Sequence, residues 1–240
     1  MISWMQGMVR ADARGYLTAA AVNLVMSARE DPDTRAAVSG ATLAVPDGMP
    51  LVWALRALGH REATRVYGPE LMARFCARAA ASGTPVYLYG GRTPEALELL
   101  RRRLRARFPG LAIAGGYSPP FREPTPSEQQ EIAREINSTG AQVVWVGIGQ
   151  PKQERWMAMM RPRLEAPLLV GVGAAFDFHA GLVPQAPAWM QRSGLEWSYR
   201  LWQEPRRLWR RYARYNPLFV GGFARQYLAH ALSRPRAGRR

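Results

Sequence analysis

Cysteine and histidine are scarce in this sequence. A single cysteine, Cys76, excludes an internal disulfide framework. Together with only three histidines in the chain, it supplies no zinc-like cluster. Cys76 lies in the segment LMARFCARAA, whose spacing predicts the buried face of a helix, and no histidine is near it in sequence to activate the thiol. We therefore interpret Cys76 as a structural residue, and we expect no metal site.

Long uninterrupted apolar runs are missing as well. The best candidate, residues 166–183, contains Asp177, His179 and several glycines, so it is a poor membrane-spanning segment. Charged residues from Arg10 onward interrupt the first apolar stretch, so it does not have the pattern of a secretion signal. We expect a protein that stays in the cytoplasm and is not an integral membrane protein.

Neither common nucleotide-binding fingerprint is satisfied. GxxxxGK[ST] is absent, and the segment 142–156, QVVWVGIGQPKQERW, has Lys152 where the dinucleotide pattern needs a third glycine, which disfavours a nucleotide-dependent oxidoreductase. The segment still indicates a buried strand, a turn at Gly147 and Gly149, and a helix from about Pro151. Free helix N–H groups favour an anion, so a phosphate-bearing ligand is expected there. The alternative is a glycine turn that merely joins strand to helix.

The apolar content that is present suffices for one α/β domain. The chain has 240 residues, of which 48% are hydrophobic. Strand-like and helix-like segments alternate, and four predicted strand ends carry Gly-Gly or Gly-x-Gly, a pattern that predicts a parallel sheet with helices on both faces. We assign this domain to residues 1–187 and a basic, amphipathic C-terminal appendage to residues 188–240.

Three helix starts can be predicted from capping residues. Asp31 is expected to cap the helix after it, Thr93 the helix that begins at Pro94, and Ser127 the helix that follows. Asp31 also begins an Asp-Pro-Asp sequence like the DxD metal motif of one large class of sugar-nucleotide transferases. That motif needs an apolar strand to deliver it, whereas here it trails a helix, so no divalent metal is implied.

Two aspartates follow predicted strands. Residues 43–45 make a short strand and 50–58 a helix, so Asp47 lies at a strand's carboxyl end, where open parallel sheets bind ligands. A partly desolvated carboxylate there suits a general base, although a helix cap is the alternative. Asp177 follows Gly171-x-Gly173 in the same way, with a buried aspartate that satisfies turn amides as its alternative.

The net charge of +15 is concentrated at the C-terminal end. Residues 189–240 contain twelve arginines against Glu196 and Glu204, a net charge of +10, while the first 188 residues carry +5. A basic segment mixed with tryptophan and tyrosine can bind an anionic membrane surface or nucleic acid. An α/β protein that binds nucleic acid through this segment is therefore the competing hypothesis.

The apolar residues and some of the arginines of this basic segment recur at helical spacing. The apolar residues that recur at that spacing are Leu208, Tyr212, Tyr215 and Phe219. The arginines predicted to share one helix face, and so to meet a diphosphate together, are Arg200, Arg207 and Arg210. Pro205 is expected to bend or restart the helix.

Several motifs occur together in a fixed order. They are DGMPLVWALRALG, RVYGPELM, YLYGG, FPGLAIAGGYSPPF, VGIGQPKQERW, GVGAAFDFHAG and GLEWSYRLWQEPRRLWRRY. Over about residues 15–227 the chain resembles the WecG/TagA/CpsF family of bacterial glycosyltransferases, which includes N-acetylmannosaminyltransferases. The resemblance implies a Rossmann-like fold, no cofactor, and peripheral binding to the cytoplasmic face of the bacterial inner membrane through the appendage.

The resemblance also implies a reaction. It is the inverting, metal-independent transfer of a hexose, such as N-acetylmannosamine, its uronic acid or glucose, from a UDP-sugar to a polyprenyl-diphosphate-linked sugar. The product would serve surface or exopolysaccharide biosynthesis, and no nucleic acid partner is expected.

Roles for individual residues follow from the same resemblance. Asp47 would be the general base, Arg65 would help to hold the substrates, and Gln153 and Asp177 would line the donor pocket. The appendage residues implied to close over the site and stabilise the leaving diphosphate are Arg200, Arg207 and Arg210. The substrate-binding candidates of the strand–turn–helix segment are Gly147, Gly149, Gln150, Gln153 and Glu154, of which the last two have side chains that suit a sugar or a uracil edge.

The chain departs from the family at the end of the first strand. Members commonly have Thr-x-Asn or Ala-Asn there, whereas this sequence has Ala19 and Ala21. Thr18 and Asn23 are the neighbours that we predict to substitute for them.

Overall fold

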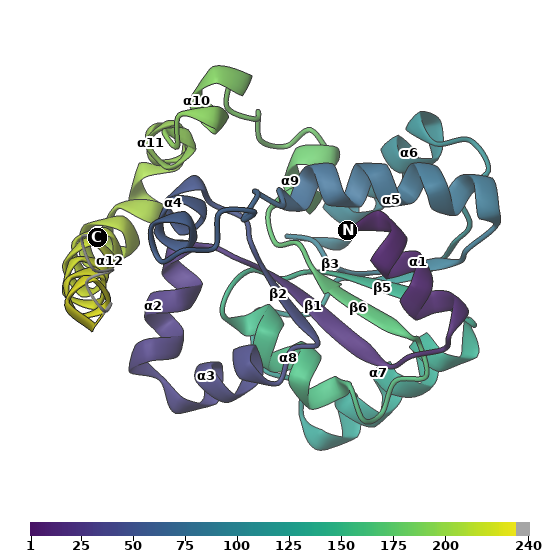
Figure 1. The fold of residues 1–240 in the computed structure, drawn as a ribbon. Helices are drawn as coiled ribbons and strands as arrows, with labels where there is room; N and C mark the ends of the chain where they lie inside the picture. The colour runs from purple at the N-terminus through teal and green to yellow at the C-terminus, as the bar shows by residue number, and fades with distance from the viewer. Residues whose placement is uncertain (234–240) are drawn as a thin grey trace.

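Six β-strands of residues 1–233, the part of the chain that the structure describes, form one sheet in the computed structural model (Figure 1). They are β1 (Gly15–Ala20), β2 (Leu43–Pro46), β3 (Val86–Gly90), β4 (Ile113–Tyr117), β5 (Val143–Gly147) and β6 (Leu168–Gly171). The order is β2-β1-β6-β5-β3-β4, and every pairing is parallel. The carboxyl ends of the strands therefore meet at one edge of the sheet.

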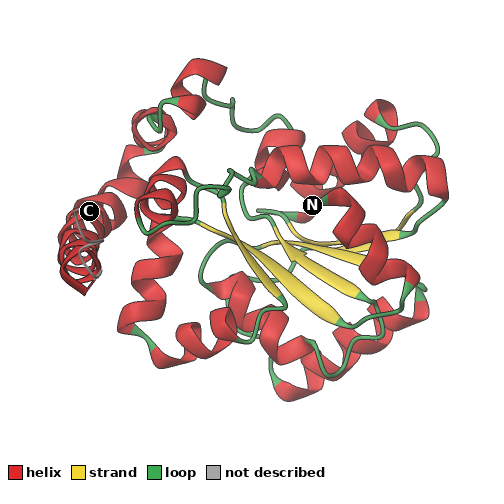
Figure 2. Ribbon diagram, viewed as in Figure 1, coloured by secondary structure: helices red, strands yellow, loops and turns green. Residues whose placement is uncertain are grey.

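Helices cover both faces of the sheet (Figure 2). On one face lie α1 (Ile2–Arg10), α5 (Gly68–Ser82), α6 (Pro94–Arg107) and α9 (Ala175–His179). On the other lie α7 (Pro126–Ser138) and α8 (Lys152–Met160). This arrangement is Rossmann-like, so the predicted fold class is confirmed.

The sequence of β5 explains why both faces need covering. Val143 and Trp145 are fully buried in the core cluster on one face, and Val144 and Val146 are fully buried in the cluster on the other. Successive side chains of a strand point to opposite faces, so a strand covered on both sides is apolar throughout. The unbroken apolar run before Gly147 is the result.

Beyond the sheet, the chain forms the C-terminal appendage, which consists of α10 (Ala188–Arg192), α11 (Glu196–Gln203) and α12 (Pro205–Ser233). The predicted restart at Pro205 is confirmed. The inner side of α12 packs on α2 (Val22–Glu30): Leu208 is fully buried, and the Ser27 hydroxyl donates to the Tyr215 hydroxyl at 3.4 Å. None of the helices described is long and apolar enough to cross a membrane.

The helix starts test the capping predictions. Asp31 caps α3 (Pro32–Ser39), because its carboxylate accepts from the Thr34 N–H at 2.8 Å, and Thr93 caps α6 as expected. The prediction for Ser127 is wrong. The cap of α7 is Thr125, two residues earlier, and Thr125 and Glu128 exchange side-chain and backbone hydrogen bonds in a capping box.

Of two further helices, the sequence predicted one and missed the other. α4 (Met49–Ala57) lies within one residue of its predicted span. The sequence did not indicate α1, although Met5 on this helix is fully buried in the core.

Candidate active site

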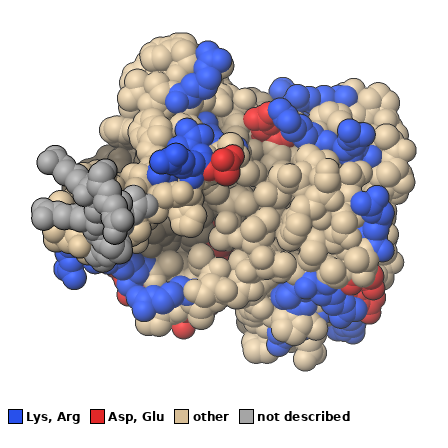
Figure 3. Space-filling view, viewed as in Figure 1, with Lys and Arg blue, Asp and Glu red and all other residues tan. Residues whose placement is uncertain are grey.

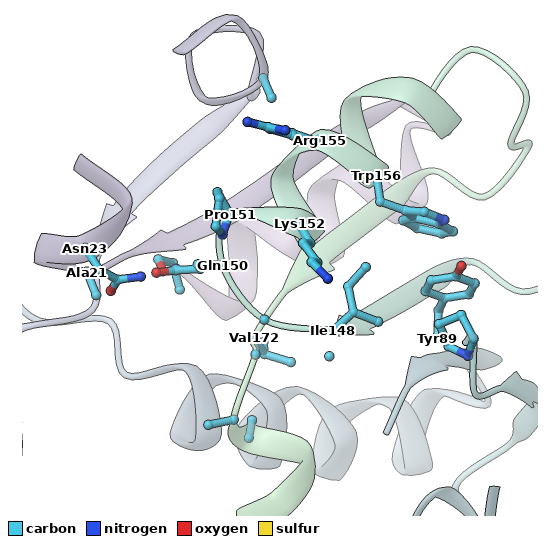
Figure 4. Close-up of a pocket in the computed structure, with 18 of the residues that line it drawn as sticks. Ala21, Asn23, Tyr89, Ile148, Gln150, Pro151, Lys152, Arg155, Trp156 and Val172 are labelled. Atoms are coloured by element: carbon cyan, nitrogen blue, oxygen red, sulfur yellow. The ribbon is translucent and has the colours of Figure 1, made fainter. Parts of the chain in front are cut away.

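A cavity of about 1200 Å³ opens at the carboxyl ends of the strands and continues along α3 and α8 as far as Tyr16 and Arg161. Its walls come from the segments that follow β1, β2, β5 and β6, from the loop after β4, and from α11 and α12 of the appendage. Figure 4 shows a close-up of this cavity. The sheet therefore supplies one side of the site and the appendage the other.

Asp47 lines this cavity directly after β2. Its backbone N–H donates to Ala20 O at 2.8 Å, which fixes the turn to the end of β1. Its carboxylate accepts from the Gly68 N–H at 3.3 Å, and 28% of the side chain remains exposed. A carboxylate that is held by the backbone and still reaches the cavity has the geometry of a general base.

Arg65 connects Asp47 to the appendage. Its Nε donates to the backbone oxygen of Asp47, and its Nη2 lies 3.9 Å from the Asp47 carboxylate. The same Nη2 donates to Glu196 Oε2 of α11 at 2.5 Å, and the guanidinium stacks 4.2 Å from the centre of the Tyr67 ring. Arg65 is not itself a lining residue, so the structure places it behind Asp47, where it orients the carboxylate and docks α11.

The surroundings of Asp47 shift its acidity. Burial raises the pKa of Asp47 to about 6, against the favourable charges of Arg65 and Arg200 and the Gly68 hydrogen bond, and the negative charge of Glu196 adds to the rise. A carboxylate with a pKa near 6 is ionised at neutral pH yet accepts a proton more readily than an ordinary aspartate.

The strand–turn–helix segment forms the floor of the cavity. Gly149 has φ +84°, a conformation that favours glycine, and a Cβ at Gly147 would lie 2.5 Å from the ring of Phe176. Gln150 Nε2 donates to Ala19 O at 2.5 Å. Figure 4 shows Gln150 beside Asn23 and beside Ala21, the N-cap residue of α2. The predicted glycine turn is present, and Gly147, Gly149 and Gln150 all line the cavity.

Three predicted substrate-binding residues lie behind the wall instead of in the cavity. Thr18 Oγ1 donates to Glu154 Oε1 at 2.7 Å, and Gln153 Nε2 donates to the same oxygen at 2.9 Å. All three side chains are at most 1% exposed, and none lines the cavity. Burial raises the pKa of the Glu154 carboxyl. The structure thus makes Thr18, Gln153 and Glu154 one buried polar cluster that joins β1 to α8.

At the corner where Ala19 and Ala21 replace the family's residues, the structure separates the two predicted substitutes. Asn23 lines the cavity together with both alanines, whereas Thr18 points to Glu154. The alternation of β1 explains the difference, because Thr18 and Ala19 face opposite sides of the strand. Of the two predicted substitutes, only Asn23 can offer its side chain to a ligand at this corner.

Asp177 lines the cavity from α9, six residues beyond the end of β6. Arg92 binds both carboxylate oxygens of Asp177, Nε at 3.0 Å and Nη2 at 2.9 Å, and its Nη2 also lies 3.0 Å from Glu204 of the appendage. Burial alone would raise the pKa of Glu204, but its pairing with Arg207 and Arg92 lowers that pKa overall. Arg92 therefore bridges the sheet side of the site and the appendage.

The arginine cluster differs from the prediction at one position. Arg200, Arg207 and Arg211 line the cavity, whereas Arg210 is exposed with its guanidinium 5.5 Å from the Trp209 ring. The prediction assumed one continuous helix, whereas Arg200 lies on α11 and the other arginines on α12. Arg211 takes the expected place of Arg210.

This arginine cluster has unused binding capacity. Within residues 1–233, the Nε atoms of Arg200 and Arg211 are buried without a hydrogen-bond partner. Burial lowers the pKa of Arg211, and the positive charges of Arg200 and Arg207 lower it further. An anion between these guanidinium groups would relieve their repulsion and accept their free N–H groups.

Sequence reasoning missed several lining residues. Lys152 projects into the cavity at the start of α8 (Figure 4), and Tyr89 and Trp156 form a stacked pair with ring centres 3.9 Å apart. Lys152 was noticeable as the sole lysine of the chain, directly after the glycine turn. The Tyr89–Trp156 pair joins residues 67 positions apart, and no local pattern predicts it. In the part of the chain described, no three metal-ligating side chains cluster.

Fold and site together are those of an α/β protein with a cavity at the strand ends that arginines and one lysine line. The model of the family described as "Glycosyl transferase WecG/TagA/CpsF family" matches residues 1–233, and the chain belongs to this family. It is therefore a glycosyltransferase, with a sugar donor and a sugar-accepting substrate.

Proposed function

We propose that this glycosyltransferase moves a hexose from a UDP-sugar to a polyprenyl-diphosphate-linked sugar, with inversion and without a metal ion. The observation that carries the proposal is that Asp47 of the sheet domain and Arg200, Arg207 and Arg211 of the appendage line one cavity. A base and a diphosphate-binding cluster in one cavity suit a direct displacement at a sugar carbon.

In the proposed step, Asp47 takes the proton of the acceptor hydroxyl while the oxygen of that hydroxyl attacks the anomeric carbon of the donor. The bond between that carbon and the UDP oxygen breaks with its electron pair, and UDP leaves. A single displacement inverts the anomeric centre. The raised pKa of Asp47, near 6, supports this role, because the carboxylate is ionised at neutral pH and becomes a weak acid after the transfer.

The departing diphosphate carries negative charge that must be stabilised. We assign this task to the guanidinium groups of Arg200, Arg207 and Arg211, with the N-terminal N–H groups of α8 and Lys152 nearby. The buried Nε atoms of Arg200 and Arg211, which have no hydrogen-bond partner, and the repulsion of Arg211 by Arg200 and Arg207 support the assignment. Gln150 and Asn23 are the amides available for the donor's polar groups.

We further propose that the appendage rests on the cytoplasmic face of the bacterial inner membrane. Its exposed large apolar side chains include Trp202, Val220 and Leu232, which are 76%, 65% and 85% exposed. Basic side chains accompany them, and Figure 3 shows Lys and Arg over the appendage and at its junction with the sheet. Exposed apolar and basic side chains together favour an anionic lipid surface. Transfer to a lipid-linked acceptor for a surface polysaccharide would take place there.

The test is transfer from a panel of UDP-hexoses to a polyprenyl-diphosphate-linked sugar. Asp47→Asn should reduce turnover by at least about 100-fold while the affinity for UDP is retained, because the amide cannot accept the proton. Asp12→Asn is the matched control, since Asp12 precedes β1 at the opposite edge of the sheet. Near-normal turnover of Asp47→Asn would remove Asp47 from the base role.

The competing hypothesis, nucleic acid binding through the basic segment, has its own readout. UDP should raise the midpoint of thermal unfolding at physiological salt, and RNA or DNA should not. Stabilisation by nucleic acid that falls steeply with salt, without any effect of UDP, would favour the competing hypothesis.

A further inference from the structure

A second hollow of the molecule is an apolar groove of about 410 Å³ between α12 and the edge of the sheet. Leu51 and Leu55 of α4 and Leu58 directly after it line one side, and Phe219 and Phe223 of α12 line the other. Figure 1 shows α12 running beside α2 and α4. Among the described residues that line the groove, only Arg29 and Gln226 have polar side chains, so its natural occupant is a hydrocarbon.

The groove and the active-site cavity share one thin wall. Ala20 lines the groove, whereas its neighbours Ala19 and Ala21 line the cavity. In the same way Pro46 lines the groove and Asp47 the cavity. Alternate side chains at a strand end face opposite sides, so the ends of β1 and β2 separate the two spaces. A molecule whose polar end reaches Asp47 can therefore place an apolar tail in the groove.

A row of aromatic rings extends the groove along α12. The rings of Phe219 and Phe223 are 6.2 Å apart, and those of Phe223 and Tyr227 are 6.0 Å apart. These residues are four positions apart, so they share one face of the helix. Beyond them Leu228 and Leu232 are exposed. The apolar path thus begins beside the catalytic carboxylate and continues to an exposed apolar helix end.

We infer that this groove, called here the α4–α12 groove, binds the first isoprenoid units of the polyprenyl chain of the acceptor. The inference rests on the proposed function, which supplies the lipid-linked acceptor, and it adds a site for the lipid part. The acceptor sugar lies at Asp47, the diphosphate follows it, and the chain passes over the strand ends into the groove and along α12. The wall position of Asp47 next to Pro46 makes this path short.

Gly222 gives a way to fill the groove. It lines the groove on α12, and a Cβ there would meet only the flexible end of Arg29, at 2.5 Å from Nη1. Gly221 is the matched control, because it does not line the groove and a Cβ there meets nothing within 4 Å. Ala44→Phe is a second filling variant, on the opposite wall and at an exposed position of β2.

The experiment compares the binding of farnesyl diphosphate and of inorganic diphosphate to the full chain by calorimetry, without detergent. The wild type should bind farnesyl diphosphate at least about 10-fold more tightly, because the farnesyl chain leaves water. Gly222→Phe and Ala44→Phe should reduce this preference to less than about 3-fold and keep the affinity for diphosphate. Gly221→Phe should keep the preference.

Three results would overturn the inference: equal binding of both ligands by the wild type, binding of neither, or an unchanged preference in both filling variants. A single-chain lysophospholipid that displaces farnesyl diphosphate with equal affinity would also overturn it, since the groove would then not be an isoprenoid site. If the wild type bound farnesyl diphosphate but transferred no sugar, the proposed function would fail while the groove assignment stood. Retained diphosphate affinity shows that a filling variant is folded.

Discussion

The two sides of the active site are built in different ways. On the sheet side, Asp47 follows a short strand and is held by the backbone of Ala20 and Gly68. On the appendage side, the arginines stand on helices that ion pairs fasten to the sheet, namely Arg65 with Glu196 and Arg92 with Glu204. Backbone hydrogen bonds at strand ends are insensitive to salt, whereas partly exposed ion pairs are weakened by it.

The difference teaches that the base and the anion-binding groups can be separated experimentally. The base should remain in place when the appendage is altered, because its supports lie in the sheet domain, apart from the Arg65 link to Glu196. The contribution of Arg200, Arg207 and Arg211 to stabilising the leaving group should depend on how the appendage is docked. The predictions below test this separation.

The largest effect should come from ending the chain after Pro187. This removes all three cavity-lining arginines of the appendage, so transfer should fall by about 1000-fold or more. Sedimentation with anionic vesicles should be lost as well. Circular dichroism must show that the remaining domain is folded, because α2 then loses its cover of α12. A shortened, folded chain that kept both sugar transfer and vesicle binding would contradict the roles proposed for the appendage.

The next effect distinguishes two neighbouring arginines. Arg211→Gln should lower kcat by about 100-fold, because Arg211 lines the cavity and the loss removes a charge that meets the diphosphate. Arg210→Gln removes the same charge from the adjacent exposed position and should change kcat by less than about 3-fold. Steady-state kinetics on both variants decides the matter. Equal losses would mean that kcat depends on the net charge of the appendage and not on the position of Arg211.

The pH dependence of transfer should report the link between the two sides. Because we propose ionised Asp47 as the base, kcat/KM should fall as the pH drops below about 6. Glu196 raises the pKa of Asp47, so Glu196→Gln should move this acid limb to lower pH. Glu70→Gln is the control, because Glu70 pairs with the exposed Arg74 away from the cavity. An acid limb that did not move would uncouple Glu196 from the base.

The smallest effect concerns stability. The pKa of Asp47 is about 6 in the fold and 3.8 normally, so protonation favours the folded state. The favourable contribution is complete below pH 4 and is lost as the pH rises through 6. Asp47→Asn should therefore stabilise the protein at pH 8 by at most about 3 kcal/mol, with no such gain below pH 4. Urea denaturation at the two pH values measures this, and an equal gain at both would point to contacts instead of charge.

The fold was largely predictable because its signals are local. Glycine at strand ends, capping residues such as Asp31 and Thr93, and apolar runs of strand length fixed the order of the elements. The error at Ser127 had a local remedy, since Thr125 and Glu128 form the Thr-x-x-Glu pattern of a capping box. The short helix α1 was missed because no capping side chain marks its start at Met1, although Ile2, Met5 and Val9 have helical spacing and pack on the core.

The site was predictable in its positions along the chain but not in the directions of its side chains. Asp47, Gln150 and Asp177 line the cavity, as their places after strands indicated. Thr18 and Glu154 looked equally well placed, yet each satisfies the other inside the wall. Which side of a strand end faces the ligand depends on register, and one residue decides it.

The buried thiol of Cys76 has a practical consequence. It is fully buried, and burial raises its pKa to about 12, so it should resist alkylation in the folded protein. A second cysteine introduced at an exposed position of the appendage, as in Trp202→Cys, could then be labelled with a fluorophore while the native Cys76 is kept. Energy transfer from such a dye to a lipid acceptor dye would follow the approach of the appendage to a bilayer in real time.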